Sequence, residues 1–153
     1  MLEIEQKAPD FSLKNQDEKT IKLSDFKGKK VAIYFYPKDD TPGCTKQGCN
    51  IRDNFSKLKK KGIIILGISK DSVQKHKKFS EKYRFNFPIL SDEKGEVIEK
   101  YGVFKEKTIF GKSFMGINRT TFLIDEKGII KKIIKKPDVS NHSEEIIRGF
   151  MSH

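Results

Sequence analysis

The chain has 153 residues, of which 35% are apolar and 35% are charged, and it carries a formal net charge of +11. The length is typical of one domain with a sizeable core, and we expect a single domain over residues 1–153. The twelve Phe residues and the repeated Ile, Val and Leu runs exclude a disordered chain, because they supply enough apolar surface for a buried core.

The basic charge does not by itself indicate nucleic-acid binding. Only four of the 32 basic residues are Arg, whereas base recognition favours the planar guanidinium group. The Lys residues are also spread along the whole chain rather than gathered in one tail. We therefore expect a Lys-rich solvated surface and no specific nucleic-acid partner.

The first five residues have neither the basic start nor the apolar run of a signal peptide. No apolar stretch approaches the roughly 18 residues that span a bilayer. We expect a soluble cytoplasmic protein without a membrane partner. In that reducing compartment, two cysteines are more often catalytic or metal-binding than structural.

The apolar pattern predicts strands and helices in alternation. In chain order they are a β-hairpin (11–13 and 20–23), a capped helical turn (24–28), a buried strand (31–36), a long helix (41–61), a second buried strand (63–68), a helix (72–83), a short strand (88–90), a short helix (93–101), a second hairpin (121–125 and 129–134) and a final helix (143–151). Both buried strands are apolar on two faces, which is typical of central, often parallel, strands. The order predicts a thioredoxin-like α/β fold, with a central mixed sheet flanked by helices and an N-terminal β-hairpin.

The segment between the first buried strand and the long helix contains the first of two cysteines, Cys44. Pro37, Pro42 and Gly43 end the strand in a tight loop, which places Cys44 in the first turn of the helix. The unpaired N–H groups and the partial positive charge of a helix N-terminus favour thiolate over thiol. Cys44 is therefore predicted to be a reactive thiol, and a small buried hydrophobic residue is the alternative.

Two carboxylates in the same loop, Asp39 and Asp40, would oppose ionisation of Cys44 if they pointed at the sulfur. An additional cation is therefore needed. Arg119, directly before a predicted strand, is the candidate. A Cys–His pair is poorly supported, because all three His residues are distant in the sequence.

The second cysteine, Cys49, follows Cys44 by five residues. Five residues of ideal helix rise about 7.5 Å and turn about 500°, which leaves the two Cα atoms about 8.6 Å apart. A disulfide requires about 7 Å or less, so local unwinding must come first, and Gly48 makes it easier. We predict a switching pair; a static disulfide and two unrelated thiols are the alternatives. A metal site would need further ligands that no local cluster supplies.

This segment resembles the active site of the peroxiredoxins, whose pattern is Pro-x-x-x-Thr-x-x-Cys and which reads here Pro37, Thr41 and Cys44. The surrounding YFYPKDDTPGCT and the second cysteine five residues on are similar to the bacterioferritin comigratory protein, or peroxiredoxin Q, subfamily. The resemblance spans nearly the whole chain, with further matches in APDF, LGIS, LSD and TFLID.

The resemblance implies that Cys44 is the peroxidatic cysteine, which attacks the O–O bond as a thiolate. It implies that Thr41 hydrogen-bonds the peroxide and that Pro37 shields the sulfur from water. Arg119 would stabilise the thiolate and polarise the leaving oxygen, and the N–H groups of Gly43 and Cys44 would bind the peroxide oxygens. From the residues alone, Thr41 can equally be an N-cap, Pro37 a strand terminator and Arg119 a surface residue.

The resemblance also implies a catalytic cycle. Cys49 would be the resolving cysteine, which condenses with the sulfenic acid of Cys44 to an intramolecular disulfide. Hydrogen peroxide or organic hydroperoxides would be the substrates, and thioredoxin or a glutaredoxin-like protein the reductant. No metal or organic cofactor is implied. One chain can complete such a cycle, so we expect a monomer, or a dimer at most.

Two other function classes stay open at this point. A thioredoxin-like disulfide carrier or redox-regulated binding module would use the same fold, although the chain lacks the Cys-x-x-Cys motif. Nucleic-acid binding through the Lys surface would show a steep dependence on salt concentration.

Overall fold

The computed structural model describes residues 2–151 of the chain. The strands are β1 (Ser12–Asn15), β2 (Thr20–Lys22), β3 (Lys30–Phe35), β4 (Ile63–Ser69), β5 (Ile89–Ser91), β6 (Phe104–Ile109), β7 (Lys112–Ile117), β8 (Thr120–Ile124) and β9 (Ile130–Ile134). The helices are the 3-10 helix η1 (Leu23–Phe26) and α1 (Pro42–Asp53), α2 (Phe55–Lys60), α3 (Val73–Tyr83), α4 (Glu96–Lys100) and α5 (His142–Met151). Within residues 2–151, none of the helices combines the length and the apolar character needed to cross a bilayer.

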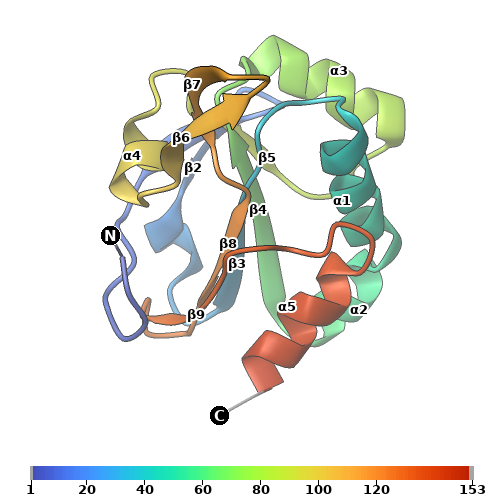
Figure 1. Cartoon of the computed structure of the whole chain (residues 1–153). Helices are drawn as coiled ribbons and strands as arrows, with labels where there is room; N and C mark the ends of the chain where they lie inside the picture. Colours follow the sequence, from blue (N-terminus) through green and yellow to red (C-terminus); the bar gives the residue numbers. More distant parts are fainter. Residues whose placement is uncertain (1, 152–153) are drawn as a thin grey trace.

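A seven-stranded mixed sheet in the order β2-β1-β5-β4-β3-β8-β9 forms the centre of the molecule (Figure 1). Strands β3, β4 and β5 are parallel to one another, whereas β8 runs antiparallel to β3 and β1 antiparallel to β5. The predicted central mixed sheet is confirmed. The N-terminal hairpin is also confirmed as the antiparallel pair of β1 and β2.

The central strand β3 buries side chains on both faces of the sheet, because successive residues of a strand point to opposite sides. Val31, Ile33 and Phe35 lie in one core with α4 and the N-terminal segment. Ala32 and Tyr34 lie in a second core, which α1, α2, α3 and α5 cover. Figure 1 shows α1, α2 and α5 on one side of the sheet and α4 on the other.

The predicted single helix over 41–61 is wrong, because the structure divides it at Asn54 into α1 and α2. Asn54 has a φ of −110° and a ψ of 15°, and its side-chain nitrogen donates to the Asn50 carbonyl at 2.8 Å. An Asn side chain competes in this way with the backbone for helical hydrogen bonds. Ile51 and Leu58 nevertheless both face the core, as their spacing predicted.

The hairpin of β6 and β7 was not among the predicted elements. Its two-residue turn, Phe110-Gly111, has positive φ at both positions, 52° and 78°. Such turns usually contain Asn-Gly or Asp-Gly, so Phe at the first position hides the signal. The strands themselves are rich in Lys and largely exposed, and they give no clear apolar pattern.

The remaining elements follow the predictions with shifted ends. Ser72 caps α3 as expected, since its hydroxyl accepts from the Lys75 N–H at 3.2 Å. The turn expected at 24–28 begins instead at Leu23, and the helix expected at 93–101 is only α4, which starts after Gly95 with φ at +75°. The second hairpin is confirmed as β8 and β9.

Candidate active site

Cys44 lies at the start of α1, directly beyond the end of the central strand β3. Thr41 occupies the N-cap position and Pro42 the first helical turn, where its missing N–H costs no hydrogen bond. The first turn of α1 contains no acidic residue. The Cys44 side chain is buried, with only 2% of the residue exposed. A buried thiol therefore faces the helix end that stabilises negative charge.

Arg119 is brought to Cys44 by the pairing of β8 with β3. Because Phe35 pairs with Thr120, the residue before β8 lies beside the chain that leaves β3 toward α1. The Arg119 Nη2 atom lies 3.2 Å from Cys44 Sγ. A Cβ atom on Gly43 would lie 3.1 Å from the same Nη2, so the absence of a side chain at Gly43 allows this close approach.

The sequence interpretation missed Gln47, which shares the guanidinium with Cys44. Arg119 Nη1 donates to Gln47 Oε1 at 2.6 Å, so the two arms of the fork bind one residue each. Gln47 is fully buried, and within the described part of the chain its Nε2 has no hydrogen-bond partner. Helical periodicity could have indicated Gln47, because residues three apart share a face of a helix.

Lys107 of β6 adds a second positive charge near the sulfur. Burial lowers the pKa of this ammonium group, the positive charge of Arg119 lowers it further, and negative charge on Cys44 acts in the opposite direction. The sequence interpretation could not place Lys107, because the hairpin that presents it was not predicted.

The two carboxylates that could have opposed a thiolate turn away from Cys44 and toward α3. Asp39 binds His76 and the Tyr36 hydroxyl, whereas Asp40 accepts from Lys82 Nζ and the Tyr83 hydroxyl, both at 2.8 Å. These donors lower the pKa of Asp40. The negative charge of the loop is thus paired with groups of α3 rather than directed at the sulfur.

Thr41 and Pro37 lie in the loop that leads to Cys44. The Thr41 hydroxyl donates to the Lys38 carbonyl at 2.8 Å and makes no capping bond, although the residue has the N-cap position. Its carbonyl accepts the first helical bond, from the Thr45 N–H at 2.8 Å. Pro37 is partly buried just after β3. Because the Thr41 hydroxyl donates in this bond, its oxygen can still accept a further hydrogen bond.

Cys49 lies in the same intact helix as Cys44, and both are free thiols. Cys49 is only partly buried. The residue before it, Gly48, packs so closely on the Phe85 ring that a Cβ there would lie 2.5 Å from Cζ. Gly48 therefore has a packing role in addition to the predicted easing of helix unwinding.

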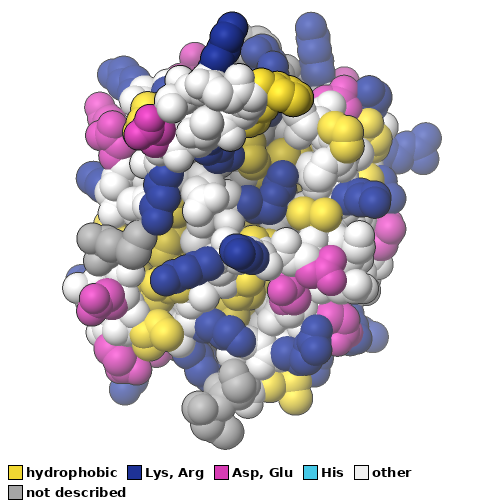
Figure 2. Space-filling view, in the orientation of Figure 1, with side chains coloured by type: hydrophobic (Ala, Val, Ile, Leu, Met, Phe, Trp, Pro, Cys, Tyr) yellow, Lys and Arg dark blue, Asp and Glu magenta, His cyan; other side chains and the backbone are white. Residues whose placement is uncertain are grey.

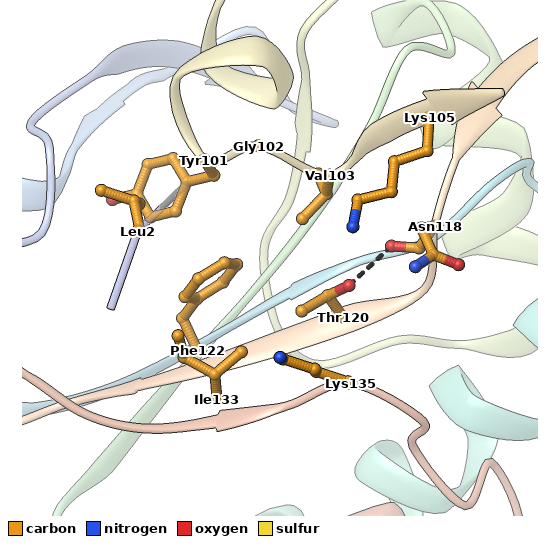
Figure 3. A pocket seen from close by; sticks show the side chains of 10 residues that line it. All are labelled: Leu2, Tyr101, Gly102, Val103, Lys105, Asn118, Thr120, Phe122, Ile133 and Lys135. Atoms are coloured by element: carbon orange, nitrogen blue, oxygen red, sulfur yellow. Dashed lines mark hydrogen bonds between the residues drawn. The ribbon is translucent and has the colours of Figure 1, made fainter. Parts of the chain in front are cut away.

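Figure 3 shows a small cavity of about 50 Å³, and Cys44 is not among the residues that line it. Tyr101, Val103 and Phe122 line it, and all three belong to the core on the α4 side. None of the predicted site residues lines this cavity. On the face in Figure 2, Lys and Arg side chains are scattered among acidic ones rather than gathered in one basic patch.

Comparisons with known proteins agree with this arrangement. The AhpC/TSA family model matches residues 4–133. The chain is 51% identical to a putative peroxiredoxin bcp of Coxiella burnetii over 146 residues, which cover 95% of this chain and 97% of the relative. The chain belongs to the peroxiredoxins of the AhpC/TSA family. It is also 46% identical to peroxiredoxin Bcp of Escherichia coli K12, over 95% of this chain and 94% of that protein.

A solved peroxiredoxin structure shares the fold. The crystal structure of a PrxQ mutant from Xylella fastidiosa superimposes with a TM-score of 0.92 at 30% identity, and covers 99% of this chain and 96% of that one. The thioredoxin-like fold predicted from the order of elements is thus confirmed. Membership of the peroxiredoxins makes the chain a thiol peroxidase.

Proposed function

We propose that this peroxiredoxin reduces hydrogen peroxide and organic hydroperoxides with Cys44 as the peroxidatic cysteine. The observation that carries the proposal is the 3.2 Å contact between Arg119 Nη2 and the buried Cys44 Sγ at the start of α1. The guanidinium and the helix N-terminus both favour the thiolate. The thiolate is the nucleophile that attacks an O–O bond.

In the first half of the cycle, Cys44 Sγ attacks one peroxide oxygen and the O–O bond breaks. The sulfur is oxidised to sulfenic acid, and the leaving oxygen takes up a proton to depart as water or an alcohol. Arg119 stabilises the charge that develops on the oxygens, and the N–H groups of Gly43 and Cys44 act in the same direction. Thr41 accepts a hydrogen bond from the peroxide, and Pro37 limits the access of water.

In the second half, the Cys49 thiol condenses with the Cys44 sulfenic acid, which forms a disulfide and releases water. Both cysteines lie in the intact α1, where ideal geometry separates their Cα atoms by about 8.6 Å. Turnover therefore includes local unfolding of α1 around Cys49. A thioredoxin or glutaredoxin-like dithiol then reduces the disulfide. We further propose that one domain of a cytoplasmic monomer completes this cycle.

The test is peroxide consumption by the purified chain with thioredoxin, thioredoxin reductase and NADPH. The wild type is expected to oxidise NADPH in proportion to peroxide, and mass spectrometry should detect a Cys44–Cys49 disulfide. Cys44→Ser should abolish the activity. Cys49→Ser should allow one round of peroxide reduction and lose thioredoxin-supported turnover, because the sulfenic acid has no resolving thiol.

Three results would contradict parts of the proposal. Full activity of Cys44→Ser would show that another group reduces the peroxide. Slow oxidation of the wild type by peroxide, together with rapid exchange with protein disulfides, would instead indicate a disulfide carrier. Normal turnover of Cys49→Ser would mean that the reductant attacks the sulfenic acid directly and that Cys49 is not needed.

A further inference from the structure

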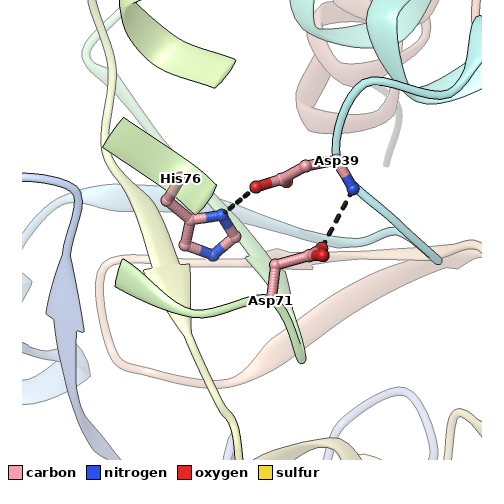
Figure 4. Close-up of side chains that lie close together, drawn as sticks. All are labelled: Asp39, Asp71 and His76. Atoms are coloured by element: carbon pink, nitrogen blue, oxygen red, sulfur yellow. Dashed lines mark hydrogen bonds and ion pairs between the residues drawn. The ribbon is translucent and has the colours of Figure 1, made fainter. Parts of the chain in front are cut away.

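A buried hydrogen-bond network connects α3 to the loop before Cys44 (Figure 4). His76 of α3 places Nδ1 2.6 Å from Asp39 Oδ2. The other ring nitrogen, Nε2, lies 2.9 Å from the Leu90 carbonyl oxygen. His76 is fully buried, and 6% of the Asp39 side chain is exposed. None of these contacts takes part in the proposed cycle, so the network needs a separate explanation.

The geometry fixes where the protons of this network lie. A carbonyl oxygen can only accept, so His76 Nε2 carries a proton and donates it to Leu90. The 2.6 Å distance between Nδ1 and Asp39 Oδ2 requires a second proton between these two atoms. The pair is therefore neutral overall, as imidazolium with carboxylate or as imidazole with carboxylic acid. Such a pair is well suited to a buried position.

The other oxygen of Asp39 is equally satisfied. The Tyr36 hydroxyl donates to Asp39 Oδ1 at 2.6 Å. Burial raises the pKa of Tyr36 well above its ordinary value, and the charge of Asp39 raises it further, so this phenol stays protonated as a donor. The Asp39 backbone N–H donates to Asp71 Oδ2 at 2.9 Å, and that oxygen also accepts from the Ser69 hydroxyl at 2.7 Å.

A metal ion is a poorer explanation for the same three side chains. One ligand atom from each of Asp39, Asp71 and His76 lies within 4.8 Å of the others. However, Zn²⁺ bonds of about 2.0–2.2 Å at tetrahedral angles would hold two ligand atoms about 3.3 Å apart. The 2.6 Å between Nδ1 and Oδ2 accommodates a proton and not an ion.

The anchored residue lies beside a sharp turn of the loop. Asp40, the next residue, has a φ of +57°, in the left-handed region, which is uncommon for residues with a side chain although Asp tolerates it better than most. The bonds from Lys82 and Tyr83 to Asp40 are exposed and contribute little. The buried bonds of Asp39 are thus the firm attachment of the segment that ends in Thr41 and Cys44.

We propose that Asp39 and His76 are a positioning pair for peroxide reduction, which holds loop 37–43 so that Thr41 and the first turn of α1 meet the peroxide at Cys44. The inference rests on the proposed function. Neither side chain touches the peroxide. They act through the loop, in which a displacement of about 1 Å can cost about a hundredfold in rate.

The test measures the second-order rate constant for oxidation of Cys44 by hydrogen peroxide, in full-length reduced protein. The chain has no Trp, so quenched flow with mass spectrometry is the suitable readout. Asp39→Ala removes both acceptors and should slow oxidation by about tenfold to a hundredfold. Asp39→Asn should recover most of this loss, since its amide can donate to a neutral His76 Nδ1 while its oxygen still accepts from Tyr36.

Two further variants complete the design. Oxidation of Cys44 in His76→Leu should be as slow as in Asp39→Ala. This substitution also risks misfolding of α3, so the two Asp39 variants carry the test on their own. Ser72→Ala is the matched control, because it removes only the N-cap bond of α3 and lowers the melting temperature without touching Asp39. Its rate constant should equal that of the wild type.

Three outcomes would overturn the inference. Asp39→Ala could react as fast as the wild type, Asp39→Asn could be as slow as Asp39→Ala, or Ser72→Ala could be equally slow. The second outcome would mean that the charge of Asp39 matters rather than its hydrogen bonds, and the third that any loss of stability slows the reaction. A wild type that does not react with peroxide would instead contradict the proposed function.

Discussion

The two halves of α1 are held in different ways. The first turn, with Cys44, is fixed from three directions: by Arg119, by the loop that α3 anchors and by burial against the sheet. The second half, with the partly buried Cys49, also packs Ile51 into this core, and Asn50 attaches it to the start of α5. That side chain donates to the Ser140 carbonyl at 2.9 Å and accepts from the Ser143 N–H at 2.8 Å.

This difference matches the two tasks of a peroxidatic helix. A nucleophile reacts fastest in a fixed geometry, so its end of the helix benefits from rigidity. A resolving thiol must leave its helical position to reach the sulfenic acid, so its end benefits from contacts that can separate. The following predictions test this division.

The largest effect is expected at Arg119. Arg119→Ala removes the cation that contacts Cys44 Sγ and should lower the rate constant for peroxide reduction by about a hundredfold or more. Arg148→Ala, at an exposed position of α5, is the matched control and should change nothing. Single-turnover oxidation of Cys44 is the measurement. A rate within twofold of the wild type would show that the first half of α1 does not depend on this contact.

A smaller effect of opposite sign is expected at Asn50. Asn50→Ala removes two hydrogen bonds to the loop before α5 and to its first turn, each worth about 1 kcal/mol. Local unfolding of the second half of α1 should become easier. The Cys44–Cys49 disulfide should therefore form up to about tenfold faster after a peroxide pulse. Asn141→Ala, which alters only an exposed bond in the same loop, is the control. An unchanged or slower rate would contradict the division.

A few-fold effect is expected at Gly43. A Cβ there would lie 3.1 Å from Arg119 Nη2, so Gly43→Ala should displace the guanidinium by a few tenths of an ångström. Oxidation of Cys44 should slow by about threefold to tenfold, by the same dependence of rate on geometry. Stability should not fall, because Ala favours helix over Gly. A drop in melting temperature without a drop in rate would show that the contact tolerates the methyl group.

The smallest effect is expected in the pH dependence of stability, through α5, which contacts the second half of α1. Burial lowers the pKa of His142, at the start of α5, below its ordinary value of 6.5, although Glu145 opposes this shift. The unfolded chain then binds a proton more readily than the folded one. His142 therefore contributes stability that is present above about pH 6.5 and is lost as the pH falls through the lowered pKa.

Urea unfolding at pH 7.5 and pH 5.5 measures this contribution. We expect the wild type to lose about 1 kcal/mol more than His142→Gln between these values. Glu145 contacts His142, but the other carboxylates of the chain contribute equally to both proteins, so the difference isolates the pair of His142 and Glu145. Equal losses would show that protonation of this side chain does not affect folding.

The sequence predicted those features that depend on local chemistry. The apolar runs at 31–36 and 63–68 predicted central strands, and Pro42-Gly43 predicted that Cys44 lies in the first turn of a helix. Arg119 was a candidate because it precedes a predicted strand. In the structure, the pairing of Phe35 with Thr120 brings it to the sulfur.

The remaining features depend on contacts between distant segments. His76 is 37 residues from Asp39, and no local pattern indicates their bond. The direction of the Asp39 and Asp40 carboxylates, toward α3, follows from the backbone of the loop and from partners on another helix. The other two misses have a local cause. Asn54 interrupts an otherwise helical pattern, and Phe110 stands at a turn position where Asn or Asp is usual.

The two cores on opposite faces of β3 have a consequence for how the protein can evolve. Cys44 belongs to only one of them, so in the proposed cycle α1 opens while the core on the α4 side stays closed. Substitutions in the core on the α4 side would change the resting stability of the chain without contacting α1, whereas substitutions around α1 would also change the rate of turnover. Selection can therefore adjust the lifetime of this protein through a core that takes no direct part in its turnover.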